Sequence, residues 1–152
     1  MNQKYTTLEQ AEYLNSIIGG DTADMMYSWE RCEETGWEGY VESLDPFPET
    51  HHFKEDRYPD IPCWSCTALI EEVLPGEILV GSTRYILDIR PLHTSLVEKD
   101  RKVCTVGYRS FDITTGDTQR NLNVRIGSVL FDVVFELVLS LIAQGIIERK
   151  KV

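Results

Sequence analysis

The sequence predicts an α+β fold in which helices pack on an antiparallel sheet of roughly four strands. Residues 8–18 and 129–143 repeat apolar side chains at the spacing of a helix. Residues 77–126 instead alternate apolar and polar side chains, which is typical of strands. Because the helical and strand patterns occupy separate stretches of the chain, the fold class is α+β with an antiparallel sheet.

Length and charge limit the number of domains and the kind of partner that the chain can bind. The 152 residues have the size of a single domain, over residues 1–152. Residues 1–60 hold 14 acidic and 4 basic side chains, whereas residues 61–152 hold 11 of each, so the net charge of −10 lies in the first half. This argues against nucleic-acid binding through phosphate neutralisation. It is compatible with a protein partner that has a basic surface, or with a solvated face that favours solubility.

The acidic half is expected to begin with a helix. Thr7-Leu8-Glu9-Gln10 has the form of a capping box, and Gly19-Gly20 ends the helix. A second short helix is predicted from about Asp21 to Trp29. Prolines interrupt residues 30–60, which predicts an ordered loop with one short strand near Gly39–Leu44. Because long loops often carry function, this loop is a candidate location for a site.

The second half is expected to contain a short central helix over residues 61–74, with Pro62 in its first turn. Strands over 77–80 and 83–90 form a hairpin around Gly81-Ser82. A loop over 91–101 precedes strands over 102–113 and 121–126, with a bulge expected at Gly107. In the last strand, strict alternation predicts an apolar face turned inward and a polar face turned to water.

The last helix is predicted from Val129 to about Ala143, with Ser128 as its cap. Its side chains are apolar nearly all the way round, so the helix must be covered on every side. This predicts a homodimer through the C-terminal helix, or complete burial in one chain. Asp132 and Glu136 make a membrane span unfavourable, so no membrane contact is expected.

Cys63-Trp64-Ser65-Cys66 is the sharpest candidate for chemistry. A Cys-x-x-Cys at a helix N-terminus is suited to thiol redox chemistry, because the helix dipole lowers the pKa of the first thiol. Thioredoxin-like sites place this motif after a buried strand. Residues 56–61 do not show the pattern of an apolar strand, which favours a structural role for the two cysteines.

The same cysteines also suggest a zinc site. Cys63 and Cys66, together with Cys32 and either His51 or His52, supply three thiolates and an imidazole for tetrahedral zinc. Structural zinc sites usually combine two short-spaced pairs of ligands, and only one is present here. Apart from this zinc alternative, no cofactor is expected.

No catalytic residue is predicted. The chain has histidines only at 51, 52 and 93 and lacks Gly-x-Ser-x-Gly, and its adjacent acidic pairs diverge on a helix. One solvated strand face is expected to be cationic and either to dock the acidic half internally or to bind an anionic partner. The arginines that it is predicted to carry are Arg84, Arg90, Arg109 and Arg125.

Three short motifs carry a family resemblance. They are Thr7-Leu8-Glu9-Gln10 with Leu14, Thr22-Ala23-Asp24-Met25, and Ile61-Pro62-Cys63-Trp64-Ser65 with Leu69 and Leu74-Pro75. In these motifs the chain resembles a group of small uncharacterised proteins encoded by phages and mobile elements of gut bacteria. The resemblance covers the first half and the closing helix. Cys66 departs from the pattern of the group, and the resemblance implies no activity and no catalytic residue.

Together these patterns predict a non-enzymatic binding or accessory protein in the cytoplasm. The polar residues 1–5 do not have the apolar core expected of a signal peptide, and the four cysteines are too few for a secreted disulfide scaffold. The alternative is a Cys-x-x-Cys protein that binds structural zinc or performs thiol redox chemistry. A hydrolase or nuclease in the acidic loop is a third class, but no dyad supports it.

Overall fold

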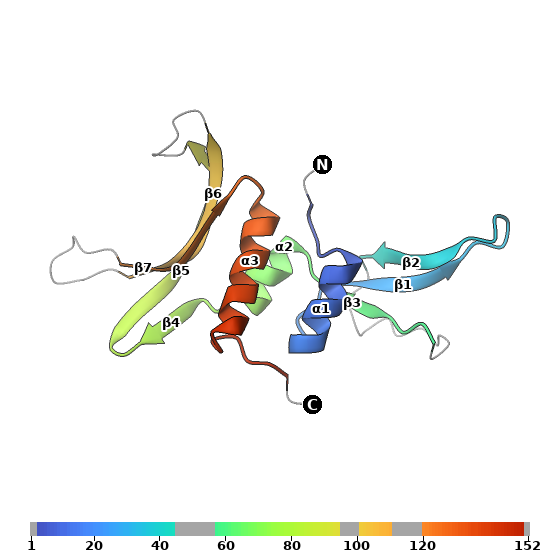
Figure 1. Cartoon of the computed structure of the whole chain (residues 1–152), viewed down its shortest axis with the longest axis horizontal. Helices are drawn as coiled ribbons and strands as arrows, with labels where there is room; N and C mark the ends of the chain where they lie inside the picture. Colours follow the sequence, from blue (N-terminus) through green and yellow to red (C-terminus); the bar gives the residue numbers. More distant parts are fainter. Residues whose placement is uncertain (1–2, 45–56, 95–100, 111–119, 151–152) are drawn as a thin grey trace. The chain divides into compact units, whose positions relative to one another are not determined.

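The computed structural model describes residues 3–44, 57–94, 101–110 and 120–150 (Figure 1). The fold is α+β with antiparallel sheets and packed helices, as the sequence predicts. The chain forms two compact units. The N-terminal unit contains Lys4–Leu69 and Glu148–Val152, and the C-terminal unit contains Met1–Gln3 and Ile70–Ile147. The boundary therefore follows Leu69 rather than the change in composition at residue 60.

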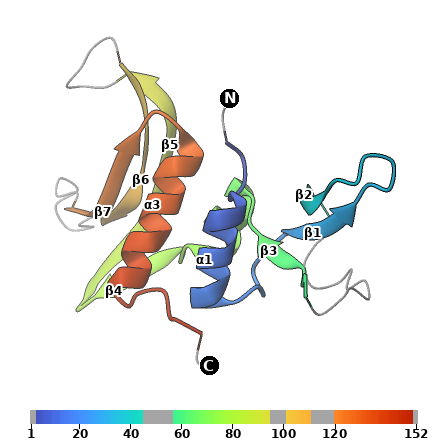
Figure 2. The ribbon, with the colours of Figure 1, turned by 45° about the vertical axis from the view of Figure 1, so that its right-hand side comes forward.

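The N-terminal unit packs one helix against a three-stranded sheet. Its elements are α1 (Leu8–Ile18), β1 (Met25–Arg31), β2 (Glu38–Ser43), β3 (Ile61–Cys63) and the short α2 (Cys66–Ala68). The strands are antiparallel in the order β2-β1-β3, and Figure 2 shows α1 beside β3. The core of this unit joins α1 to the sheet through Ala11, Met25, Tyr27, Ile61 and Cys63.

Helix α1 confirms the predicted capping box. The Thr7 side chain accepts from the Gln10 N–H at 3.2 Å, and the Gln10 side chain accepts from the Thr7 N–H at 2.9 Å. Gly19 ends the helix with φ 73°, a conformation that glycine adopts without strain. The end of the chain returns to this point, where the Lys150 N–H donates to the Ile17 carbonyl at 2.7 Å. One carbonyl that the helix end leaves without an internal partner is thereby satisfied.

The predicted second short helix is wrong, because residues 25–31 form β1. This strand lies between two others, so Met25 pairs with Cys63 and Trp29 pairs with Tyr40. Every side chain from Met25 to Ser28 is buried. Apolar and polar residues therefore do not alternate here as they do in a strand with one solvated face. The strand expected near Gly39–Leu44 is confirmed as β2. The part of the predicted loop at residues 45–56 lies outside the described residues.

The predicted central helix is also partly wrong. Ile61-Pro62-Cys63 is a buried strand, and the helical segment begins only at Cys66, where Ser65 is the cap. The following turns, Leu69–Val73, are π-helical (η1). Pro62 fits the strand because β3 pairs with β1 along one side, and proline is tolerated at strand edges.

The C-terminal unit contains the predicted four-stranded antiparallel meander. Its strands are β4 (Glu77–Val80), β5 (Thr83–Thr94), β6 (Lys102–Ser110) and β7 (Arg120–Gly127), in that spatial order. The β4–β5 hairpin turns at Gly81, which has φ 62°. Strand β5 runs through residues 91–94, where a loop was expected. A register shift between Arg90 and His93 accommodates Pro91, which has no N–H to donate.

The predicted bulge lies opposite Gly107, but the extra residue is on β7. Val106 pairs with Arg125 and Tyr108 with Leu122, so two steps on β6 span three on β7. Asn123 has φ 54° at this point. A Cβ on Gly107 would lie 2.7 Å from the Val124 Cα, so the close approach of the two strands requires glycine.

Helix α3 (Leu130–Ala143) contacts β6 and β7 and lies along one face of the sheet (Figure 1). It begins after Val129, which makes no side-chain capping bond, so the cap predicted at Ser128 is wrong. Eight of its apolar residues, including Phe131 and Leu137, are buried within the single chain. Their burial does not require a second copy, and a dimer through α3 stays a prediction. None of the described helices is long and apolar enough to cross a membrane.

Candidate functional site

The Cys-x-x-Cys segment connects a strand to a helix, but not in the way the sequence suggests. Cys63 is the last residue of β3 and is completely buried, and Cys66 is the first residue of α2. The short strand that precedes the motif was missed because three residues are too few to show alternation. The first thiol therefore lies in the sheet, away from the helix end that would lower its pKa.

Buried polar contacts hold this segment to the start of the chain. The Thr6 hydroxyl contacts the Cys63 Sγ at 3.4 Å and accepts from the Trp64 N–H at 3.1 Å. The Tyr27 hydroxyl donates to the Thr6 carbonyl at 2.7 Å. Thr6 is completely buried, so these bonds satisfy polar groups that would otherwise be costly. The arrangement is that of a structural network.

The two residues between the cysteines are tied to the segment that precedes β1. The Trp64 Nε1–H donates to the Thr22 hydroxyl at 2.9 Å. The Ser65 N–H donates to Asp24 at 2.9 Å, and its hydroxyl donates to the second oxygen of the same carboxylate. Ser65 also caps α2 by accepting from the Ala68 N–H at 3.1 Å. Each of these contacts positions backbone, and none presents a reactive group.

The pKa values of the Cys63 and Cys32 thiols are shifted in opposite directions. Burial raises the pKa of the Cys63 thiol to about 11, which keeps it protonated near neutral pH. Hydrogen bonds lower the pKa of Cys32, first from the Thr35 side chain and then from backbone N–H groups of Thr35 and Glu34. Thiolate character is thus favoured at Cys32 and disfavoured at Cys63. The redox hypothesis for the Cys-x-x-Cys motif loses its electrostatic basis.

The proposed zinc ligands are separated along β1. Cys63 pairs with Met25 at the start of this strand, whereas Cys32 follows Arg31 at its end. Seven strand residues span about 20 Å, so one metal ion cannot bind both cysteines. Within the described ranges, no three His, Cys, Asp or Glu side chains gather as a metal site. His51 and His52 lie outside the described residues.

A second candidate is the outer part of the β1–β2 hairpin, residues 29–40, here called the acidic hairpin. It carries four glutamates and one arginine, a net charge of −3. Trp29 stacks on Tyr58 with ring centroids 3.8 Å apart, and Tyr40 meets Trp29 edge-on at 5.2 Å. The Tyr40 hydroxyl donates to the Pro59 carbonyl at 2.9 Å. These contacts make the base of the acidic hairpin rigid.

Trp37 is the exposed anchor of the acidic hairpin. Its side chain is 51% exposed, although large aromatic rings are usually covered. The ring lies over Gly39, where an added Cβ would meet it at 2.9 Å. The absence of a side chain at Gly39 therefore leaves room for the indole against the strand. On the same hairpin Arg31 pairs with Glu38 at 3.0 Å, and Glu30, Glu33 and Glu34 are exposed.

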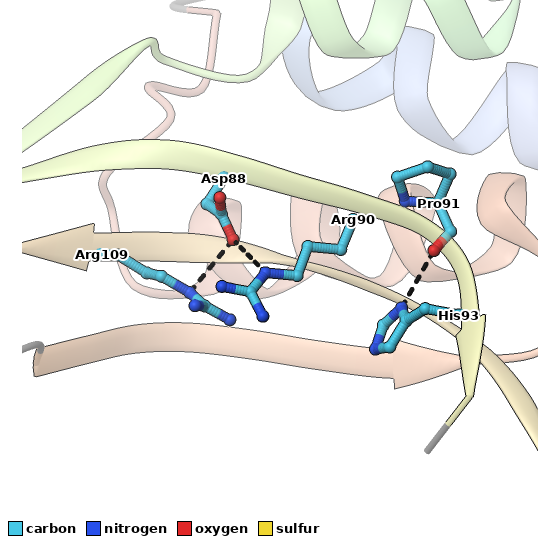
Figure 3. A network of polar contacts seen from close by, with 5 residues as sticks. All are labelled: Asp88, Arg90, Pro91, His93 and Arg109. Carbon is cyan, nitrogen blue, oxygen red and sulfur yellow. Dashed lines mark hydrogen bonds and ion pairs between the residues drawn. The ribbon is translucent and has the colours of Figure 1, made fainter. Parts of the chain in front are cut away.

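A third candidate is the sheet face opposite α3 in the C-terminal unit, here called the open sheet face. Figure 3 shows its polar centre, where Asp88 pairs with Arg109 at 3.0 Å and with Arg90 at 3.4 Å. On the same strand, the His93 Nδ1 lies 2.9 Å from the Pro91 carbonyl oxygen. Arg109 is mostly covered, whereas the Arg90 side chain is 52% exposed. Asp88 and Arg109 thus form a fixed pair beside a more available arginine.

Of the four arginines predicted to share a cationic face, Arg84, Arg90 and Arg109 lie on one face of the sheet, whereas Arg125 lies on the other. Its guanidinium donates to the Ser140 hydroxyl of α3 at 2.9 Å, so it lies on the helix-covered face. The extra residue at Asn123 reverses the faces of the residues that follow it. For the same reason Ile126, expected to point inward, is 63% exposed.

The comparisons with known proteins add no constraint. No protein-family model, no curated protein and no solved structure matches the chain.

Proposed function

We propose that the chain is a non-enzymatic binding protein that engages a basic protein surface through its acidic hairpin. The observation that carries this proposal is the exposure of Trp37, held over Gly39 on a hairpin that also carries exposed glutamates. Tryptophan and arginine are the side chains most enriched among binding hot spots. An indole face also attracts cations, and the surrounding carboxylates would pair with lysine or arginine.

The rigidity of the acidic hairpin supports this role. A preformed binding element loses little conformational freedom when its partner docks. Trp29, Tyr40 and Tyr58 hold the base of the hairpin, and the Cys32 N–H donates to the Trp37 carbonyl at 2.7 Å to close its turn. The cytoplasmic location and the family resemblance stay predictions from the sequence.

A defined peptide tests the proposal. The probe is a labelled peptide of alternating arginine and leucine, compared with a peptide in which glutamate replaces arginine, and binding is measured by fluorescence anisotropy. The chain is expected to bind only the basic peptide, with affinity that falls as salt is added. Trp37→Ala should weaken binding about tenfold or more.

Tyr13→Ala is the matched control, because Tyr13 is an aromatic residue of α1 with a similar exposed fraction of 54%. It should bind as the unmodified chain does. Equal binding by Trp37→Ala and the unmodified chain would rule out the acidic hairpin as the binding element.

A further inference from the structure

The open sheet face combines exposed apolar side chains with arginines. Leu79, Ile86 and Ile126 are 66%, 46% and 63% exposed. The pairing registers place Ile86 beside Arg109, and Arg90, Thr105 and Ile126 in one row across three strands. Large aliphatic side chains exposed together on one sheet face are typical of an interaction surface.

The sheet is also basic within an acidic protein. On the open sheet face itself, the three arginines Arg84, Arg90 and Arg109 outnumber the two carboxylates Glu77 and Asp88, a net charge of +1, while the whole chain has −10. Asp88 is already held by Arg109, and Arg90 is half exposed at a longer distance from the same carboxylate. Because a guanidinium has five N–H donors, Arg90 retains donors for a further carboxylate.

We infer that the acidic hairpin of one copy docks on the open sheet face of a second copy, so that the chain self-associates head to tail. This inference rests on the proposed function, because it names the partner of the same hairpin. Trp37 supplies the apolar group that fits beside Ile126, in the row across the strands that also carries Arg90. Glu33 and Glu34 supply carboxylates for the half-exposed Arg90, whereas Arg84 is already paired with Glu77. The charges of the two surfaces are opposite, which is what a specific contact between them requires.

The contact is heterologous, since the two surfaces are different parts of the chain. Such contacts form closed rings or open chains, whereas a two-fold dimer would bury the same surface twice. The association is therefore expected to proceed beyond a dimer as concentration rises. It is also expected to weaken with salt, because part of the attraction is between exposed charges.

Sedimentation velocity on the whole chain tests the inference. At low salt the weight-average mass should rise with protein concentration, and high salt should return it toward that of the monomer. Arg90→Glu and the pair Glu33→Lys with Glu34→Lys should each weaken association about tenfold or more, because like charges then face each other. Arg149→Glu and Glu72→Lys are the matched controls, as both alter exposed charges outside the two surfaces.

Mixing the Arg90→Glu chain with the Glu33→Lys, Glu34→Lys chain distinguishes contact between two chains from contact within one chain. The Arg90→Glu chain keeps an intact hairpin, and the Glu33→Lys, Glu34→Lys chain keeps an intact sheet face. Their mixture is expected to form a one-to-one complex that grows no further, although each variant alone is monomeric. Docking of the hairpin on the sheet of the same chain predicts no such complex.

A monomeric mass at every concentration at low salt would overturn the inference, as would unchanged association of Arg90→Glu. The proposed function is tested separately, by binding of the basic peptide. A monomeric chain that still binds the basic peptide through Trp37 would leave the hairpin a binding element for a different basic partner.

Discussion

The Asp24 carboxylate accepts hydrogen bonds from both the N–H and the hydroxyl of Ser65. These bonds hold the Cys-x-x-Cys segment to the residues that precede β1. Ser65 in turn caps α2 through the Ala68 N–H. One carboxylate thus determines where β3 ends and where the helical turn begins. The Cys-x-x-Cys motif, which most resembles a reactive site in the sequence, therefore has a structural role.

Replacing this carboxylate should destabilise the protein. Asp24→Ala removes a charged acceptor of two hydrogen bonds, and we expect a loss of about 1–2 kcal/mol because the site is exposed to water. Asp21→Ala is the control, since it removes the same charge from a nearby exposed position. Urea denaturation measures both variants, and equal stability of the two would contradict the role given to Asp24.

The thiols should differ in reactivity. Cys32 has a lowered pKa and is partly exposed, whereas Cys63 and Cys104 are buried and have raised pKa values. Iodoacetamide at mildly alkaline pH should alkylate Cys32 first and the two buried cysteines only on unfolding. Peptide mass spectrometry measures the extent of alkylation of each cysteine over time. The Cys32→Ser substitution should abolish the fast phase of alkylation. Rapid alkylation of Cys63 in the folded protein would restore the redox hypothesis.

Stability should fall in alkaline solution. Burial raises the pKa of Cys63 from an ordinary value of 9.0 to about 11, so the folded state binds the thiol proton more tightly than the unfolded state. The resulting stabilisation is complete below pH 9 and is lost as pH rises to about 11, by up to about 3 kcal/mol. Burial also raises the pKa values of Tyr27 and Tyr108, which act in the same direction at higher pH.

Cys63→Ala separates the contribution of the thiol. Its unfolding free energy, measured by urea at several pH values, should decline less steeply between pH 9 and 11 than that of the unmodified chain. Cys66→Ala serves as the control for loss of a thiol outside the buried network. Parallel pH profiles for all three chains would show that the pKa of Cys63 is the same in the folded and unfolded states.

The bulge opposite Gly107 should be intolerant of a side chain. Gly107→Ala places a Cβ 2.7 Å from the Val124 Cα, and backbone cannot move aside easily, so we expect a loss of about 1–3 kcal/mol. At Gly76 an added Cβ would meet nothing within 4 Å, which makes Gly76→Ala the control. Thermal unfolding compares the two. A stable Gly107→Ala would mean that the β6–β7 register relaxes without cost.

Several elements follow from local sequence alone, because their signals depend on neighbouring residues. The capping box at Thr7 and Gln10, the stop at Gly19 and the hairpin turn at Gly81 are all confirmed. The period of two from residue 77 onward predicts the meander, and the apolar run after Val129 predicts a buried helix. The helices and turns satisfy their own backbone hydrogen bonds or turn geometry, and the strands of the meander pair with the next strand along the chain.

The misassigned elements depend on partners distant in the sequence. Residues 25–28 form a strand because β2 and β3 cover both of its edges, and burial of both faces hides the alternation. Ile61-Pro62-Cys63 is a strand because it pairs with β1, and Ile61 and Cys63 are buried in the core with α1. The candidate sites shift accordingly, since the separation of Cys32 from Cys63 is set by the length of β1.

What the sequence by itself determined is the fold class, the acidic first half and the helices and turns that local hydrogen bonds define. Only the tertiary structure decided which side chains meet. It buried Cys63, left Trp37 exposed over Gly39, and turned Arg125 toward α3 by a single extra residue at Asn123. The physical reason is that strand pairing and its register are set by contacts between distant segments, and a shift of one residue exchanges the two faces of a strand.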